Sequence, residues 1–246
     1  LRAMGLRPHA IAADNYFVDR KDNPRDEDGN YDFECLGAMD LRKLNEDMVR
    51  LLDGSQIELP VFNFREGVRE YHGEYLQIGN EDVVIMEGIH SLNPEMTYML
   101  GDSDKYKIYI SPLNQLYVDS EAGEPVKVST IDSRLIRRIV RDNRTRGNGV
   151  EKTLSMWASV RRGEEKYIFP YESEADAMFN SGLLYEYTAL RSAAAPLLSN
   201  VGMDSEYYED AQRLLRFVNL FEDIDTEYIP ANSILREFIG GGCFRI

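Results

Sequence analysis

The segment DVVIMEGIH, residues 82–90, is the strongest strand signal in the sequence. Its four consecutive apolar residues are followed by Glu87 and Gly88, the pattern of a buried parallel strand that ends on an acid. The run HAIAADNY, residues 9–16, has the same form and places Asp14 at its carboxyl end. Segments with helical periodicity alternate with such strands along the chain. The sequence therefore predicts an α/β fold with a mainly parallel sheet flanked by helices, in which ligands bind beyond the carboxyl ends of the strands.

Weaker signals complete this alternation. After a polar loop at 18–31, we expect a helix that begins at Asp40 as its N-cap and ends at Gly54. The expected strand at 57–64 carries Pro60, which indicates an edge or a strand end. The remaining expected elements are a charged link at 65–73, a short strand at 74–78, a strand at 106–110, a hairpin or loop insertion at 111–129, a helix at 151–167, a strand at 175–180, helices from 183 to about 221 interrupted near Pro196 and Gly202, and a short helix at 233–239.

The segment TIDSRLIRRIVRDNRTRGNG, residues 130–149, predicts an amphipathic helix with Thr130 or Asp132 as its cap and Gly147 with Gly149 at its end. Its arginines are Arg134, Arg137, Arg138, Arg141, Arg144 and Arg146, and its apolar side consists of Leu135, Ile136, Ile139 and Val140. A face made only of arginine favours bidentate recognition of phosphate or carboxylate. Ion pairs with the 43 acidic residues are the alternative.

The amino-acid composition of the chain argues against several classes of function. The formal net charge of −15 argues against broad nucleic-acid binding, because affinity for a phosphate backbone depends on a basic surface. Cys35 and Cys243 offer neither metal-ligand spacing nor a disulfide framework, which fits a reducing, cytoplasmic compartment. We find no signal peptide and no apolar run of about 18 residues, so we expect no membrane span.

Five segments in order resemble the uridine kinase branch of the P-loop kinases, a family that also includes phosphoribulokinase. AADNYF resembles its strand-end aspartate motif, YDFECLGAMD its Asn-Phe-Asp segment, and ELPVFNF the segment that places aromatic residues against a nucleoside. VVIMEGIH resembles its acidic second metal motif, and DSRLIRRIVRDNRTRG its arginine-rich lid. The resemblance runs from about residue 8 to 180 and implies a P-loop-kinase-type fold.

Beyond about residue 183, the chain is similar to bacterial uridine-kinase-like proteins whose kinase domain follows an N-terminal domain related to threonyl-tRNA synthetase. We therefore expect a kinase-like domain at 1–182, with its lid at about 130–168, and a C-terminal helical extension at 183–246 packed on it. The sequence contains no G-x-x-x-x-G-K-[ST] loop, and GNGVEKT has Glu151 where the second glycine is required. Because LRAMGLRP has the pattern of the last turn of a helix, we expect Leu1 to be a truncation point, with the loop upstream of it in the parent protein.

The resemblance implies ATP-dependent phosphoryl transfer, with Mg²⁺, to a hydroxyl of a small molecule, foremost a nucleoside. Asp14 would accept the proton of the attacking hydroxyl, and Glu87 would lie near the magnesium, through water. From the residues alone, Asp14 as a loop-capping residue and Glu87 as a solvated strand end stay open. The lid arginines that would meet substrate and phosphates are Arg138, Arg141 and Arg146. Arg134 and Arg137 match the family less well and suit ion pairs, and Arg161 with Arg162 suits a solvated helix face.

The residues expected to contact the acceptor follow from the same resemblance. Phe33, Phe62 and Phe64 fall where the family lines the base, with plain core packing as the alternative. Glu34 aligns with an aspartate that the family uses on the ribose hydroxyls. His90 either contacts the substrate or caps a helix near Pro94.

Two departures from the family pattern keep the acceptor open. The pyrimidine-reading histidine of the family falls near Gly67, with His72 five residues further on, and a further lid arginine falls at Asn148. A kinase for another acceptor, such as a sugar phosphate or pantothenate, is one alternative. A non-catalytic kinase-like domain that binds a nucleotide or an RNA-linked partner is another. For this chain alone we expect weak or no ATP binding, and the oligomeric state, including a homo-oligomer, stays open.

Overall fold

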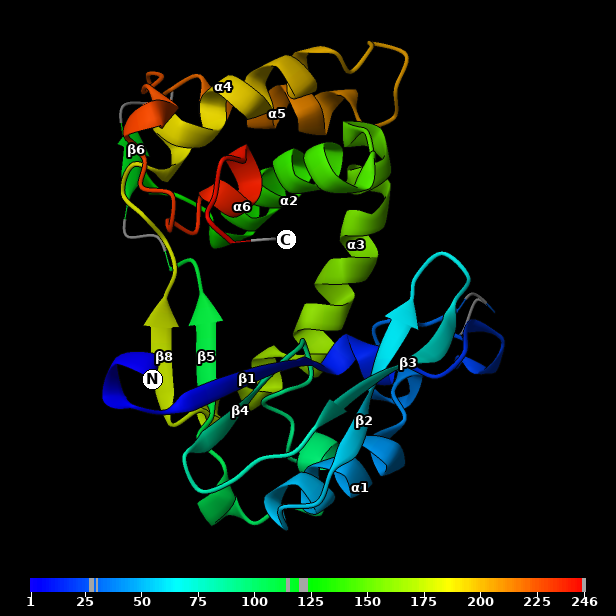
Figure 1. The fold of residues 1–246 in the computed structure, drawn as a ribbon. Helices are drawn as coiled ribbons and strands as arrows, with labels where there is room; N and C mark the ends of the chain where they lie inside the picture. Colours follow the sequence, from blue (N-terminus) through cyan, green and yellow to red (C-terminus); the bar gives the residue numbers. More distant parts are fainter. Residues whose placement is uncertain (27–28, 30, 114–115, 120–123, 245–246) are drawn as a thin grey trace. The chain divides into compact units, whose positions relative to one another are not determined.

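The fold is that of a computed structural model, which describes residues 1–26, 29, 31–113, 116–119 and 124–244. It confirms the α/β class (Figure 1). The strands are β1 (Arg7–Ala12), β2 (Ile57–Asn63), β3 (Val68–Leu76), β4 (Asp82–Glu87), β5 (Ile108–Ser111), β6 (Tyr117–Asp119), β7 (Pro125–Lys127) and β8 (Ala177–Asn180). The α-helices are α1 (Leu41–Leu52), α2 (Thr130–Arg146), α3 (Val150–Tyr167), α4 (Glu186–Ser199), α5 (Tyr208–Val218) and α6 (Arg236–Ile239).

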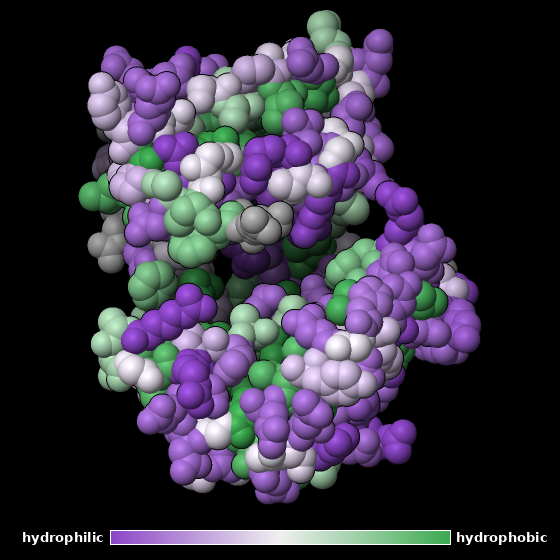
Figure 2. All heavy atoms as spheres, viewed as in Figure 1, coloured by the Kyte–Doolittle hydropathy of each residue, from purple (hydrophilic) through white to green (hydrophobic). Residues whose placement is uncertain are grey.

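The chain divides into two compact units. The first consists of Leu1–Tyr109 and Val160–Ala177, and the second of Ile110–Ser159 and Met178–Ile246. The face drawn in Figure 2 is largely hydrophilic, as expected of a chain in which 29% of the residues are charged. None of the described helices is both long and apolar enough to cross a membrane. The predicted strand-end acids belong to the first unit and the arginine helix to the second.

The two strongest strand predictions are confirmed as a parallel pair. Strands β1 and β4 run in register from Arg7 opposite Asp82 to Ala12 opposite Glu87. Arg7 donates two hydrogen bonds of 2.8 Å to the carboxylate of Asp82, and His9 lies 2.8 Å from the same group. These bonds hold the amino ends of both strands together and keep the pKa of Asp82 well below its usual range. The carboxyl ends therefore lie at one edge.

The expected link at 65–73 is wrong, because β3 begins already at Val68 and forms an antiparallel hairpin with β2. Gly67 makes the turn between them with φ of +72°, in the left-handed region that favours glycine. The central part of β3 is exposed and polar, so it lacks the apolar alternation that identifies a half-buried strand. Pro60 lies at a register shift in β2, as its missing N–H leads one to expect.

Helix α1 supplies the core of the first unit. Asp40 accepts a hydrogen bond of 3.0 Å from the backbone N–H of Lys43, which confirms it as the N-cap. The buried face of the helix consists of Leu44, Met48 and Leu51, which pack with Ile11, Tyr16 and Ile57. The hydroxyl of Tyr16 donates to Asp47 over 3.2 Å inside this core, and burial raises the pKa of Tyr16. Helix α1 thereby fixes the turn that follows β1.

Helix α2 organises the second unit and is amphipathic as predicted. Its apolar residues Leu135, Ile136, Ile139 and Val140 are buried in a core shared with α4, α5 and α6. The expected caps Thr130 and Asp132 are wrong, because the side chain of Ser129 accepts from the N–H of Asp132 over 3.3 Å. Gly147 ends the helix in the left-handed conformation, as predicted.

The remaining predicted elements are present with shifted bounds. Strands β6 and β7 form the expected antiparallel hairpin, and β5 and β8 run in the same direction in Figure 1. Pro196 does not interrupt the helix around it, because α4 continues to Ser199 and ends only before Gly202. The short C-terminal helix begins at Arg236, three residues later than expected.

Candidate functional site

Two carboxylates mark the open end of the β1–β4 pair in the first unit. Asp14 lies in the 3₁₀ turn Ala13–Tyr16 directly after β1, and Glu87 is the last residue of β4, opposite Ala12. Both residues are exposed. Because the carboxyl ends of parallel strands meet at one edge, the fold brings these two predicted acids together, as the sequence indicated.

Close packing fixes the backbone that carries both acids. A Cβ atom added at Gly88 would lie 2.7 Å from the Cβ of Ala13, so the segment after β4 approaches the turn after β1 more closely than any side chain permits. The side-chain oxygen of Asn15 accepts a hydrogen bond of 3.1 Å from the N–H of Phe62. Glycine at 88 and asparagine at 15 thus hold the turn of Asp14 against β4 and β2.

Two of the predicted aromatic residues form a cluster in which sequence reasoning missed a third member. Phe62 and Phe64 meet edge to face at 5.2 Å between ring centroids, and Phe17 meets Phe62 at 5.5 Å. Phe64 is 61% exposed, so plain core packing does not describe it. Phe33 lies elsewhere, beside Tyr31 at 5.7 Å, and is also exposed. The sequence signal for Phe17 was its place at the end of AADNYF.

The structure explains the missing histidine near Gly67. A Cβ at Gly67 would lie 2.8 Å from three atoms of the Arg20 side chain, so Arg20 occupies the space that a larger residue would need. Two hydrogen bonds hold Arg20 in place. Its backbone N–H donates to the carbonyl of Gly67 over 2.8 Å, and its Nη2 donates to the carbonyl of Phe64 over 2.7 Å. His72 lies on β3 and pairs with Glu70 in an exposed position. An arginine thus lies beside the aromatic cluster.

His90 and Glu34 pack against the end of α3 within the first unit. His90 is buried, and its ring meets Tyr167 edge to face at 5.5 Å. A Cβ added at Gly163 would lie 3.0 Å from the Cβ of Glu34, so glycine leaves room for this side chain. The capping alternative for His90 is wrong, because Asn93 caps the 3₁₀ helix Pro94–Thr97.

The buried ring of His90 predicts a pH dependence of stability. Burial lowers the pKa of His90, so the unfolded chain binds a proton more readily below about pH 6.5. The free energy of unfolding is therefore expected to decrease from pH 7 to 5.5, by at most about 1.4 kcal/mol per pH unit for one proton. Urea unfolding at both pH values measures this, and His90→Gln should flatten the dependence.

The matched control for this experiment is His72→Gln, the same substitution at an exposed ring. It should keep the pH dependence of the wild type. Carboxylates with a lowered pKa, such as Asp40, act nearer pH 4 and leave this window to the histidines. A His90→Gln variant whose stability still fell as steeply as that of the wild type would contradict the assignment.

The three predicted lid arginines gather around one carboxylate in the second unit. Arg138 Nε lies 3.3 Å, Arg141 Nη2 3.0 Å and Arg146 Nη1 3.5 Å from the carboxylate of Asp142. Asp142 is fully buried, whereas the three arginine side chains keep part of their surface in solvent. Asp142 was not among the predicted residues, although it lies four residues from both Arg138 and Arg146.

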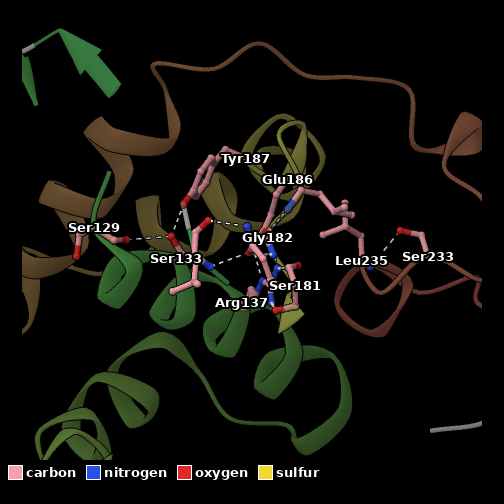
Figure 3. A network of polar contacts seen from close by, with 12 residues as sticks. Ser129, Ser133, Arg137, Ser181, Gly182, Glu186, Tyr187, Ser233 and Leu235 are labelled. Atoms are coloured by element: carbon pink, nitrogen blue, oxygen red, sulfur yellow. Dashed lines mark hydrogen bonds and ion pairs between the residues drawn. The ribbon is translucent and has the colours of Figure 1, made fainter. Parts of the chain in front are cut away.

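Three other arginines have structural contacts. Arg137 is buried and pairs with Glu186, and its Nη2 donates to the carbonyl of Ser181 over 2.9 Å (Figure 3). The ion-pair expectation for Arg137 is therefore confirmed. Arg144 donates to the carbonyls of Glu237 and Phe238 at the end of the chain. The solvated face expected at Arg161 is wrong, because its side chain is mostly covered and binds the carboxylate of Glu164 at 2.5 Å.

The donor set suits Mg²⁺ held together with phosphates. Among the described residues, no three or more His, Cys, Asp and Glu side chains form a group that could hold a metal ion alone. Magnesium in phosphoryl-transfer sites keeps several waters and uses one or two carboxylates plus substrate phosphates. Glu87 fits this requirement, because it is an exposed carboxylate at a strand end.

Comparison with known proteins places these features in a family. The model of the phosphoribulokinase / uridine kinase family matches residues 9–120 and 126–185. Uridine kinases of Halobacterium salinarum and Halalkalibacterium halodurans are 29% and 31% identical over 173 residues, which is 70% of this chain and 67% and 72% of theirs. The uridine kinase of Bacillus pumilus is 30% identical over 154 residues, 62% of either chain. A putative fructose transport system kinase from Silicibacter sp. TM1040 aligns with a TM-score of 0.46 at 15% identity, over 73% of this chain and 78% of that one.

Proposed function

The chain belongs to the phosphoribulokinase / uridine kinase family, whose members are kinases, and we propose that it transfers a phosphoryl group from ATP to a hydroxyl of a nucleoside. The observation that carries this proposal is the pair of exposed carboxylates, Asp14 and Glu87, at one edge of the parallel strands. Phosphoryl transfer demands mainly positioning and charge neutralisation. A carboxylate fixed at a strand end can orient the acceptor hydroxyl or hold Mg²⁺, and the cations would supply the neutralisation.

Asp14 is the proposed base. In this role its carboxylate accepts the proton of the attacking hydroxyl, or orients that hydroxyl towards the phosphorus. The turn that carries it is held by Asn15 and Gly88, so little movement is needed during the reaction. Glu87 is the proposed magnesium-side carboxylate, acting through water. When bound, Mg²⁺ would neutralise the charge of the transferred phosphate.

The proposed contacts to the acceptor lie in the same unit. The exposed rings of Phe64 and Phe33 offer apolar surface on which a base can stack, and Phe17 and Phe62 support Phe64. In this proposal Glu34 provides a carboxylate for the sugar hydroxyls, and the buried His90, three residues after Glu87, is a further contact to the acceptor. In the second unit, Arg138, Arg141 and Arg146 are the proposed phosphate-binding residues, and ATP and Mg²⁺ are the cofactors that the family implies.

One observation favours a second class of acceptor. The guanidinium of Arg20 lies over the turn at Gly67, beside the aromatic cluster, where the related kinases are expected to read a pyrimidine with histidine. A guanidinium prefers a carboxylate or phosphate group to a neutral base edge. A sugar phosphate or another anionic hydroxyl compound is therefore the second candidate.

A screen of ATP consumption by the full-length protein tests the proposal. The acceptors are nucleosides on one side and sugar phosphates with other anionic alcohols on the other, each at millimolar concentration with Mg-ATP. Acceptor-dependent release of ADP with a nucleoside supports the first candidate, and release only with an anionic alcohol supports the second. Absence of release with every acceptor would favour a non-catalytic domain that binds a nucleotide or a partner.

A further inference from the structure

Asp142 has an unusual combination of burial and partners. Its side chain has no exposed surface, yet three guanidinium groups of its own helix reach it. Arg138 precedes it by one helical turn, Arg146 follows it by one turn, and Arg141 is its neighbour, with Nε and Nη2 at 3.1 and 3.0 Å from Oδ1. A fully buried carboxylate is found almost only where cations compensate it.

The charges in this group do not balance one to one. Arg141 and Arg146 alone bring a formal charge of +2 to one aspartate, within a chain of net charge −15. Each guanidinium has five N–H donors, and one carboxylate accepts about four hydrogen bonds, so Asp142 cannot use the donors of all three. Simple ion pairing of a basic helix with acidic neighbours would give single pairs instead.

Arg137, on the same helix, is an arginine whose guanidinium makes its hydrogen bonds inside the protein core. Its guanidinium is buried, bound by both oxygens of Glu186 and by the carbonyl of Ser181. By contrast, the side chains of Arg138, Arg141 and Arg146 are 22%, 24% and 55% exposed. Of these four arginines, Arg137 therefore lies in the core, whereas the other three reach Asp142 and keep part of each side chain in solvent.

We propose that Asp142 is a positioning residue that holds the guanidiniums of Arg138, Arg141 and Arg146 together for the phosphate groups of the substrates. This inference rests on the proposed function. Three free arginine side chains would repel one another and would lose much rotamer freedom on binding a phosphate. A buried carboxylate removes most of that repulsion and orders the side chains before the substrate arrives, which leaves an anion-binding excess of positive charge.

The test is Asp142→Asn, with two readouts. In ¹H–¹⁵N spectra of the arginine side chains, the Nε–H signal of Arg141, which donates to Asp142, should move towards that of solvated arginine and exchange faster with water. In steady-state kinetics of the full-length protein, kcat should fall about 10- to 100-fold. The KM of the acceptor hydroxyl compound should change less than about two-fold, since Asp142 acts on the phosphate-binding residues.

Asp132→Asn is the matched control, because it makes the same change on the same helix. Asp132 pairs with Arg213 at 2.7 Å and is partly exposed, so this variant should leave both readouts as in the wild type. An unchanged Nε–H signal of Arg141 in Asp142→Asn would overturn the inference, as would a kcat per folded molecule equal to that of the wild type. If the wild type itself showed no turnover with any acceptor, the proposed function would fail, and the Nε–H signal of Arg141 would still decide whether Asp142 orders the arginines.

Discussion

An Asp14→Asn variant is expected to lose phosphoryl transfer, with kcat lower than that of the wild type by about 10²- to 10⁴-fold. Asparagine keeps the shape of the side chain but cannot accept the proton of the attacking hydroxyl. Asp14 is exposed and lies in a turn fixed by its neighbours, so the fold should be preserved. The measurement is kcat at saturating acceptor and Mg-ATP, together with the urea midpoint of both proteins.

Asp22→Asn is the matched control for Asp14. Asp22 is an exposed aspartate in another 3₁₀ turn of the same unit, and its replacement should leave kcat within about two-fold of the wild type. Equal turnover by the wild type and Asp14→Asn would make Asp14 a loop-capping residue, the alternative that its position before Asn15 allows. A large loss of stability in Asp14→Asn would point to the same structural role.

The parts of the fold that were predictable are those whose apolar pattern alone determines their position. The runs of β1 and β4 were identified by their consecutive apolar residues, although most residues of both strands are only partly buried, and the acids at their ends followed. Only the end of strand β3 was predicted, as part of the expected strand at 74–78, because Tyr71 to Tyr75 are exposed and show no apolar alternation. Helix α4 continues through Pro196 because tertiary packing of Ala194 and Leu198 outweighs the local preference.

The positions of the candidate residues in the fold were predictable only where these residues follow a strand or share a helix. Asp14, Glu87 and the lid arginines were of this kind. The partners of Glu34 and His90, which are Gly163 and Tyr167, lie more than 70 residues further along the chain, and no local pattern connects them. Asp142 was overlooked for a different reason: an acid in a basic helix looks like an ordinary surface ion pair until its burial is known.

The largest expected effect on stability comes from the buried pair of Arg137 and Glu186. Glu186 has no exposed side-chain surface and Arg137 has 9%, and two hydrogen bonds join them (Figure 3). Replacing either partner leaves the other charge buried without compensation, so Glu186→Gln or Arg137→Met should lower the free energy of unfolding by about 3–5 kcal/mol. Urea unfolding followed by circular dichroism measures this loss.

A double variant separates the cost of an unpaired charge from the value of the pair. Arg137→Met with Glu186→Leu removes both charges and should recover most of the loss, because buried ion pairs are often no better than apolar packing. The exposed pair of Arg191 and Asp223 is the control, and Arg191→Met should cost about 1 kcal/mol or less. If the double variant were as unstable as the single ones, the bond from Arg137 to the carbonyl of Ser181 would be the contact that holds α2 to the segment before α4. Recovery would instead show that this segment needs apolar contact with α2 and tolerates the loss of its charges.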